Sequence, residues 1–391
     1  MYPFVLTAFA LLIFFGIEVK IRCLLNSHKL RQRLPKKTDH DHTTYLFKSA
    51  RDLIANSHYA EIVWANEIFY GEMQLSHEQS TASPIESRNF AGSYINIVNS
   101  ERQTVSSISQ NPKDWIMFGG STVLCLEVND SNTVSSCLQE IINSKTECNF
   151  QIHNYGQAGM KSKKIDHLFP LCFSRYPLAS KVTVLFGVND AGWIAGSNPS
   201  NMWQSLIDKG FDLVSKRLVS LDYLFLRLKS RRVCKASKAY AVSTLKKFRD
   251  FESTLKSRNI ECHFILQPNV FCKARPVRSE FEFIHDADPL RIAGIHAAYM
   301  TYLSDGNDIV MSALNAFDHL EEAVFLDWCH VGVKGNQLIA KTIWSLVNGC
   351  NAGVEETNDA LDLMLSNKRS ALKLLRIAAN KDEVPYNYPL Y

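Results

Sequence analysis

The sequence predicts an α/β protein: a three-layer α/β/α domain on a parallel sheet of about five strands, preceded by an apolar N-terminal membrane helix. The chain has 391 residues, of which 46% are hydrophobic and 21% charged, as in folded globular proteins. From residue 114 onward, short apolar segments alternate with amphipathic helices, the pattern of a parallel sheet covered by helices. This composition excludes a disordered chain, a coiled-coil rod and a collagen-like protein.

The N-terminal segment is apolar. Residues 2–17 carry no charge, and their length lies between a signal-peptide core and a full membrane span. No basic residue precedes them, and no small-residue cleavage site follows them. Seven basic residues come after the apolar segment: Lys20, Arg22, Lys29, Arg31, Arg33, Lys36 and Lys37. Because basic flanks tend to stay in the cytoplasm, we expect a single-pass anchor over residues 1–22 and a cytoplasmic body. A body on the opposite side of the membrane remains an alternative.

The rest of the chain divides into a lead-in, a domain and an extension. Residues 23–113 are predicted to form a basic juxtamembrane segment and a helical lead-in, with a helix near residues 49–69. The domain is predicted over residues 114–350, with a helical insertion at 201–258 and a helical extension at 351–391. The strands are expected at residues 114–118, 150–154, 182–186, 262–266 and 309–314.

Polar and glycine residues follow the predicted strands. Gly119-Gly120-Ser121-Thr122 follows the first strand, Asn154 and Gly159 the second, and Gly187-Val188-Asn189-Asp190 the third. The carboxyl ends of parallel strands meet at one edge of a sheet, where ligands bind. Each of these patterns is also common in ordinary turns and helix caps, so none is specific alone.

A carboxylate and an imidazole follow the last strand. Asp327 and His330 are three residues apart, a spacing that puts both side chains on one side of a turn. The carboxylate can then orient the imidazole and stabilise its protonated form. Ser121 and His330 are expected at the same sheet edge, as a nucleophile and its base require.

These four segments, in this order, resemble the four motif blocks of the SGNH/GDSL hydrolases. The resemblance covers about residues 110–350 and implies a flavodoxin-like order of strands. It also implies that Ser121 is the nucleophile, His330 its base and Asp327 the residue that orients His330. The oxyanion hole would be the backbone N–H groups of Ser121 and Gly159 with the side-chain amide of Asn189. The commoner Gly-Asp-Ser of the first block is Gly-Gly-Ser here, which puts the subfamily in doubt.

The sequence predicts no cofactor, no metal site and no nucleic-acid partner. Neither a dinucleotide-binding nor a P-loop glycine motif stands at a strand end. The ten cysteines include no CxxC pair, and their scatter through apolar segments favours free thiols and a reducing compartment. The net charge of +4, from 43 basic and 39 acidic residues, is too small to indicate a nucleic-acid binder.

The insertion contains a strongly basic segment. Residues 214–238 hold eight basic residues and one acid, Asp222. An apolar stripe at helical spacing runs through it: Val214, Leu218, Leu221, Phe225 and Leu228. Two interpretations remain open, a solvated helix packed on the domain and a helix that lies at an anionic lipid or substrate surface.

We interpret the chain as a membrane-anchored serine esterase that cleaves a small acyl ester through an acyl-enzyme. The expected substrate is a carbohydrate O-acyl group or a lipid ester. An O-acyltransferase with the same triad is the first alternative, because transfer differs from hydrolysis only in the acceptor of the acyl group. A non-catalytic glycan- or membrane-binding protein is the second. The sequence favours an enzyme, because a binding module does not need Ser121, Asn189, Asp327 and His330 together.

Overall fold

The computed structural model describes residues 89–92, 94–145, 148–191, 219–277, 280, 283–284 and 289–349. The predicted anchor, the lead-in helix, the first part of the insertion and the C-terminal extension lie outside these residues. Among the helices that are described, none has both the length and the apolar character needed to cross a membrane.

The predicted parallel sheet is confirmed. Its strands lie side by side in the order β5-β4-β6-β7-β8, so the second strand along the chain stands outside the first, as in a flavodoxin-like sheet. Both faces of the sheet are covered, which is why its strands read as continuous apolar runs. Each observed strand overlaps the predicted one: β4 Lys113–Gly119, β5 Phe150–Gly156, β6 Lys181–Phe186, β7 Glu261–Leu266 and β8 Val310–Ser312.

The five parallel strands agree with the prediction, but within the described residues the sheet continues to eight strands. Three short antiparallel strands precede the parallel ones: β1 Phe90–Ala91, β2 Asn96–Val98 and β3 Glu101–Arg102. The sequence analysis placed them in the lead-in region, since strands of two or three residues show no periodicity. Asn99 and Ser100 join β2 to β3 with φ values of +53° and +66°, as in the tight hairpin turns that match strand twist. Arg102 then pairs with Asn154, which places β3 beside β5.

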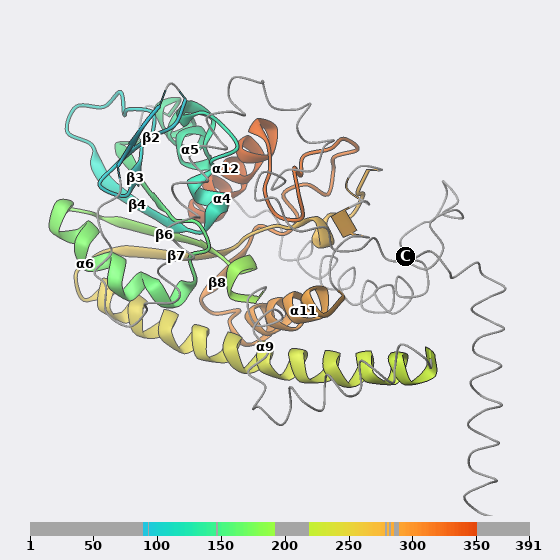
Figure 1. The fold of residues 1–391 in the computed structure, drawn as a ribbon. Helices are drawn as coiled ribbons and strands as arrows, with labels where there is room; N and C mark the ends of the chain where they lie inside the picture. The colour runs from blue at the N-terminus through green and yellow to red at the C-terminus, as the bar shows by residue number, and fades with distance from the viewer. Residues whose placement is uncertain are drawn as a thin grey trace, which may run out of the picture.

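Helices cover both faces of the sheet (Figure 1). One face packs against α5 Val134–Asn143 and α12 Val333–Val347. The other packs against α6 Ile165–Arg175, α9 Val219–Lys256 and α11 Pro289–Asp305. Neighbouring residues of β4 alternate between the two layers: Trp115 and Met117 face one core, Ile116 and Phe118 the other. Four further helical segments are single turns: α4 Ser121–Leu124, η2 Asp130–Asn132, η3 Ser162–Lys164 and η4 Val270–Cys272.

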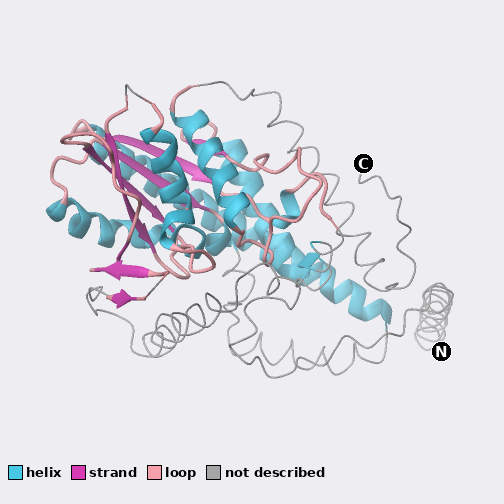
Figure 2. Cartoon of the chain, turned by 90° about the horizontal axis from the view of Figure 1, so that it is seen from above, coloured by secondary structure: helices cyan, strands magenta, loops and turns pink. Residues whose placement is uncertain are grey.

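The second half of the predicted insertion is the long helix α9. It packs on the sheet through a buried stripe made of Ala241, Leu245, Phe248, Phe251 and Leu255, and its other end extends past the edge of the sheet (Figure 2). Leu228, a member of the predicted apolar stripe, is exposed. The basic residues Arg231, Arg232, Lys235 and Lys238 are also exposed. Part of the basic segment is therefore a solvent-facing helix surface.

Candidate active site

Ser121 stands on a sharp turn between β4 and α4. The strand ends at Gly119, Gly120 precedes the helix, and Ser121 is its first residue. Both glycines are required by close contacts. A Cβ atom at Gly119 would lie 2.3 Å from Cγ2 of Val123, and one at Gly120 would lie 2.1 Å from Nδ2 of Asn189. The turn therefore presents the Ser121 hydroxyl at the carboxyl edge of the sheet.

Ser121, His330 and Asp327 form one continuous chain of contacts. The Nε2 atom of His330 lies 2.7 Å from Oγ of Ser121, and its Nδ1 atom lies 2.6 Å from Oδ2 of Asp327. With the Nδ1 proton donated to Asp327, Nε2 is free to accept a hydrogen bond from the serine hydroxyl. All three residues are buried. The arrangement is that of a nucleophile, a base and an orienting carboxylate.

Asp327 is held by the turn that it starts. Its Oδ1 atom accepts hydrogen bonds from the backbone N–H groups of Cys329 and His330, each 2.7 Å long. Burial works to raise the pKa of Asp327, but His330 and these two donors outweigh it and keep the pKa below its usual value. Burial works to lower the pKa of His330, while Asp327 foremost, with Cys329 and Glu127, raises it well above the usual value. Asp327 is therefore ionised, and His330 is a strong proton acceptor.

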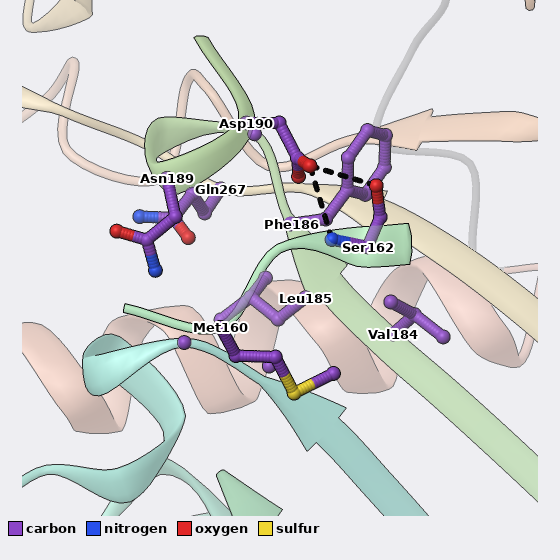
Figure 3. Close-up of a pocket in the computed structure, with 11 residues that line it drawn as sticks. Met160, Ser162, Val184, Leu185, Phe186, Asn189, Asp190 and Gln267 are labelled. Atoms are coloured by element: carbon purple, nitrogen blue, oxygen red, sulfur yellow. Dashed lines mark hydrogen bonds between the residues drawn. The ribbon is translucent and has the colours of Figure 1, made fainter. Parts of the chain in front are cut away.

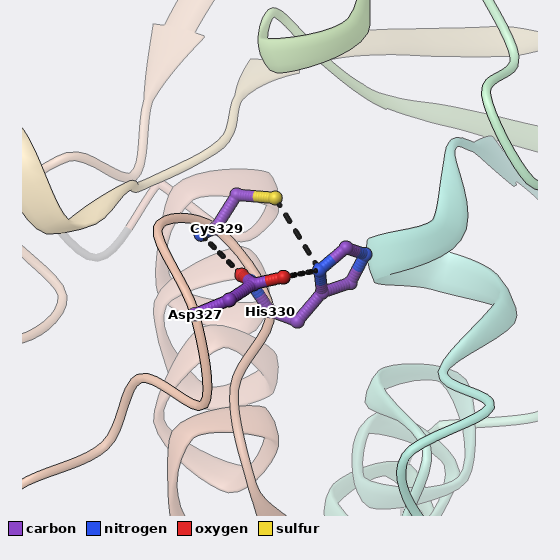
Figure 4. Close-up of side chains that lie close together, drawn as sticks. All are labelled: Asp327, Cys329 and His330. Atoms are coloured by element: carbon purple, nitrogen blue, oxygen red, sulfur yellow. Dashed lines mark hydrogen bonds and ion pairs between the residues drawn. The ribbon is translucent and has the colours of Figure 1, made fainter. Parts of the chain in front are cut away.

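Cys329 lies next to this chain. Its Sγ atom is 3.4 Å from Nδ1 of His330 (Figure 4), and the donor atoms of Asp327, Cys329 and His330 all lie within 4.8 Å of one another. Burial raises the pKa of Cys329 to about 12, so the thiol stays protonated, while a metal ligand would be the thiolate. Nδ1 already donates to Asp327. We therefore assign Asp327 and His330 to the triad with Ser121, and we do not interpret Asp327, Cys329 and His330 as a metal centre.

The predicted oxyanion groups come from the segments that follow β4, β5 and β6, and the side-chain amide of Asn189 lies close to Gly120, the residue before Ser121. The Ser121 N–H is the first of a helix and has no acceptor within that helix. Gly159 has φ +64°, a conformation that glycine adopts readily. Asn189 follows β6, and a hollow of about 10 Å³ is lined by Gly120, Met160 and Asn189 among others (Figure 3). The segments that follow β4, β5 and β6, which carry the three predicted hydrogen-bond donors, thus meet at this hollow.

Asp190 fixes the turn that carries Asn189. It is fully buried, and its Oδ1 atom accepts hydrogen bonds from the backbone N–H and the hydroxyl of Ser162, at 3.0 and 2.8 Å (Figure 3). The hydroxyl of Tyr240, on α9, donates to the same atom at 3.1 Å. Sequence reasoning treated Asn189-Asp190 as a possible turn dipeptide. In the structure, Asp190 links the loops after β5 and β6 to α9.

Sequence reasoning missed two further residues of the site. Glu127 is buried, and its Oε1 atom lies 3.8 Å from Nε2 of His330. Arg102 is also buried, and it donates to the carbonyl oxygens of Leu124, the last residue of α4, and of Cys125 and Val128 in the loop that follows. The sequence did contain a signal for Glu127, because it is a charged residue inside the apolar run Val123-Leu-Cys-Leu-Glu127-Val128. The role of Arg102 could not be predicted from its neighbours in sequence, because its partners are more than twenty residues away.

No family model matches this chain, and no curated protein matches it. Several solved structures are similar to it. An acetyl xylan esterase is 15% identical with a TM-score of 0.36, over 60% of this chain and 99% of the esterase. An acetylxylan esterase from Geobacillus stearothermophilus is 11% identical with a TM-score of 0.36, over 62% of this chain and 94% of the other. A protein from Desulfitobacterium hafniense, described as lipolytic and of the G-D-S-L family, is 11% identical with a TM-score of 0.34, over 59% and 97%. These values establish no substrate, so the function is inferred from the site.

Proposed function

We propose that the chain is a serine ester hydrolase of the SGNH type. The observation that supports this most directly is the unbroken contact from Oγ of Ser121 through the imidazole of His330 to the carboxylate of Asp327. Such a chain lets a serine hydroxyl lose its proton as it attacks a carbonyl carbon. All three groups are buried, which strengthens each charge interaction within the site.

The reaction proceeds in two halves. Ser121 attacks the ester carbonyl, its proton moves to Nε2 of His330, and the carbonyl oxygen becomes an oxyanion beside Asn189 and the N–H groups of Ser121 and Gly159. His330 then gives the proton to the leaving alkoxide, which leaves an acyl-enzyme on Ser121. In the second half, water attacks the acyl carbon while His330 takes its proton; the bond to Oγ of Ser121 then breaks, His330 returns the proton to Oγ, and the acid leaves. Asp327 keeps the imidazole in the required tautomer throughout.

The substrate is a small acyl ester, either an O-acyl group on a carbohydrate or a lipid ester. Two of the similar structures are named as acetyl xylan esterases. The test is turnover of 4-nitrophenyl acetate and of acetylated sugars, with and without free sugar acceptors. Free acetate indicates hydrolysis, and acetylated acceptor indicates an O-acyltransferase with the same triad.

Asn189→Ala is expected to lower kcat by about 10²–10³-fold with little change in KM. The side-chain amide stabilises negative charge that exists only on the oxyanion of the transition state, so its loss leaves ground-state binding nearly intact. Steady-state kinetics on 4-nitrophenyl acetate measures both constants. Asn348→Ala, at the exposed end of α12, is the matched control and should change neither. A change confined to KM would contradict the oxyanion role.

We further propose that residues 1–22 anchor the protein in a membrane with its body on the cytoplasmic side. Support comes from the uncharged residues 2–17 and the seven basic residues after them. Alkaline carbonate should fail to extract the full-length protein but should extract a version without residues 1–22. A reporter fused after Tyr391 should be cytoplasmic. An exported reporter would reverse the orientation and allow disulfides among the ten cysteines.

A further inference from the structure

Glu127 places a second carboxyl group at the catalytic imidazole. Its Oε1 atom lies 3.8 Å from Nε2 of His330, and the side chain is 4% exposed. Nε2 is also the atom that faces the Ser121 hydroxyl at 2.7 Å. The triad carboxylate, Asp327, contacts the opposite nitrogen, Nδ1. The imidazole of His330 therefore has a carboxyl group near each of its two nitrogen atoms.

The other charged groups around Glu127 do not neutralise it. Arg102 is the nearby cation from β3, but its Nε atom pairs with Asp130 at 2.5 Å and its other nitrogens donate to three carbonyl oxygens. From the loop after α4, Cys125 is a thiol whose pKa burial raises to about 12. From the 327–330 turn, Asp327 is an anion and Cys329 a protonated thiol. Of the two cations that lower the pKa of Glu127, His330 therefore has the larger effect and Arg102 the smaller one.

Glu127 and Asp327 are held differently. Asp327 accepts two backbone N–H groups as well as Nδ1, so its position does not depend on the charge of the imidazole. The carboxyl group of Glu127 interacts with the backbone of its own residue, and the side chain that it approaches as an ion pair is His330, at Nε2. Its interaction energy therefore changes with each proton that Nε2 gains or loses. Burial raises the pKa of Glu127, and His330 opposes that rise, as expected of a coupled pair.

We propose that Glu127 is a positioning residue that acts through His330: its carboxylate stabilises the proton on Nε2 and so moves the onset of activity to higher pH. This rests on the proposed esterase function. At low pH, Nε2 carries a proton held between Glu127 and Ser121, so His330 accepts none from the serine. At higher pH that proton is lost. The Ser121 proton then moves to Nε2 during attack, where Glu127 stabilises the imidazolium that forms.

Glu127→Gln in the full-length protein tests this. The glutamine has nearly the same shape but no negative charge, so the acidic limb of kcat/KM for 4-nitrophenyl acetate should move down by about 1–3 pH units. The plateau at high pH should fall, because the imidazolium of the transition state loses a partner. The variant is therefore expected to be more active than the wild type at low pH and less active at high pH. Glu140→Gln, at an exposed position on α5, is the matched control and should leave the profile unchanged.

Titration of the His330 imidazole by NMR, without substrate, gives a readout independent of turnover, with the His330 signal assigned by its loss in His330→Gln. Its midpoint should fall in Glu127→Gln, even if the protein hydrolyses no ester, so failure of this proposal is distinguishable from failure of the proposed function. An equal loss of activity at every pH with an unchanged midpoint would show a purely structural role and overturn the proposal. If Glu127→Gln does not fold, Glu127→Asp replaces it: the shorter carboxylate should move the midpoint, and an unchanged midpoint overturns the proposal equally.

Discussion

Ser121→Ala should abolish turnover, lowering kcat by about 10⁵–10⁶-fold, and should abolish covalent labelling by a fluorophosphonate probe. The hydroxyl is the atom that Nε2 of His330 faces at 2.7 Å, and alanine leaves nothing for the base to deprotonate. The change should not disturb the fold, because it removes one oxygen from the first turn of α4. Thermal unfolding followed by circular dichroism checks this.

Ser131→Ala is the control for the labelling experiment. Ser131 is an exposed serine in η2, away from any base, and its loss should affect neither labelling nor turnover. Labelling that persists in Ser121→Ala at the wild-type rate would mean that another residue is the nucleophile. The proposed mechanism would then be wrong even if the protein hydrolyses esters.

Asp327→Asn should lower kcat by about 10⁴-fold near neutral pH. The reason lies in the two backbone N–H groups that donate to Oδ1. In the variant, these two N–H groups can donate only to the carbonyl oxygen of the asparagine. Its NH₂ group therefore faces Nδ1 of His330. Nδ1 must then accept a hydrogen bond, so the imidazole proton moves to Nε2 and His330 no longer accepts the Ser121 proton.

Kinetics on 4-nitrophenyl acetate, together with NMR of the His330 ring nitrogens, test this explanation. The NMR spectrum should show the neutral ring protonated at Nε2 in the variant and at Nδ1 in the wild type. A loss of less than tenfold, or an unchanged tautomer, would show that Asp327 does not orient the base.

The parallel sheet could be predicted because its strands carry their own signal. β6 buries every residue, and β4 and β7 bury all but their first two, so the sequence shows short, mainly apolar segments between helical ones. The three antiparallel strands β1, β2 and β3 gave no such signal. Strands this short form only through their contacts with the sheet edge that they join. The turn at Asn99 and Ser100 was the clue available, and these residue types occur in many loops.

Some residues of the candidate active site could likewise be predicted from the sequence, and others could not. Ser121, Asn189 and His330 could be brought together from sequence because each follows a strand, and strand ends converge at one edge. The position of Glu127 could not, because it depends on the path of the loop after α4. That path is set by Arg102, whose contacts join residues 22 to 26 positions apart. Neither residue belongs to a motif, and each was found from three-dimensional contacts alone.

Arg102 also sets how short a working version of this protein can be. A version that begins at residue 114 would keep the parallel strands and the three residues of the triad. It would lose Arg102, whose guanidinium donates hydrogen bonds to the carbonyl oxygens of Leu124, Cys125 and Val128 and so holds the segment between α4 and η2. Glu127 lies in that segment, so such a fragment would keep Ser121 but would not hold the Glu127 carboxyl group beside Nε2 of His330. The hairpin at residues 90–102 is thus part of the catalytic unit, and a minimal enzyme has to include it.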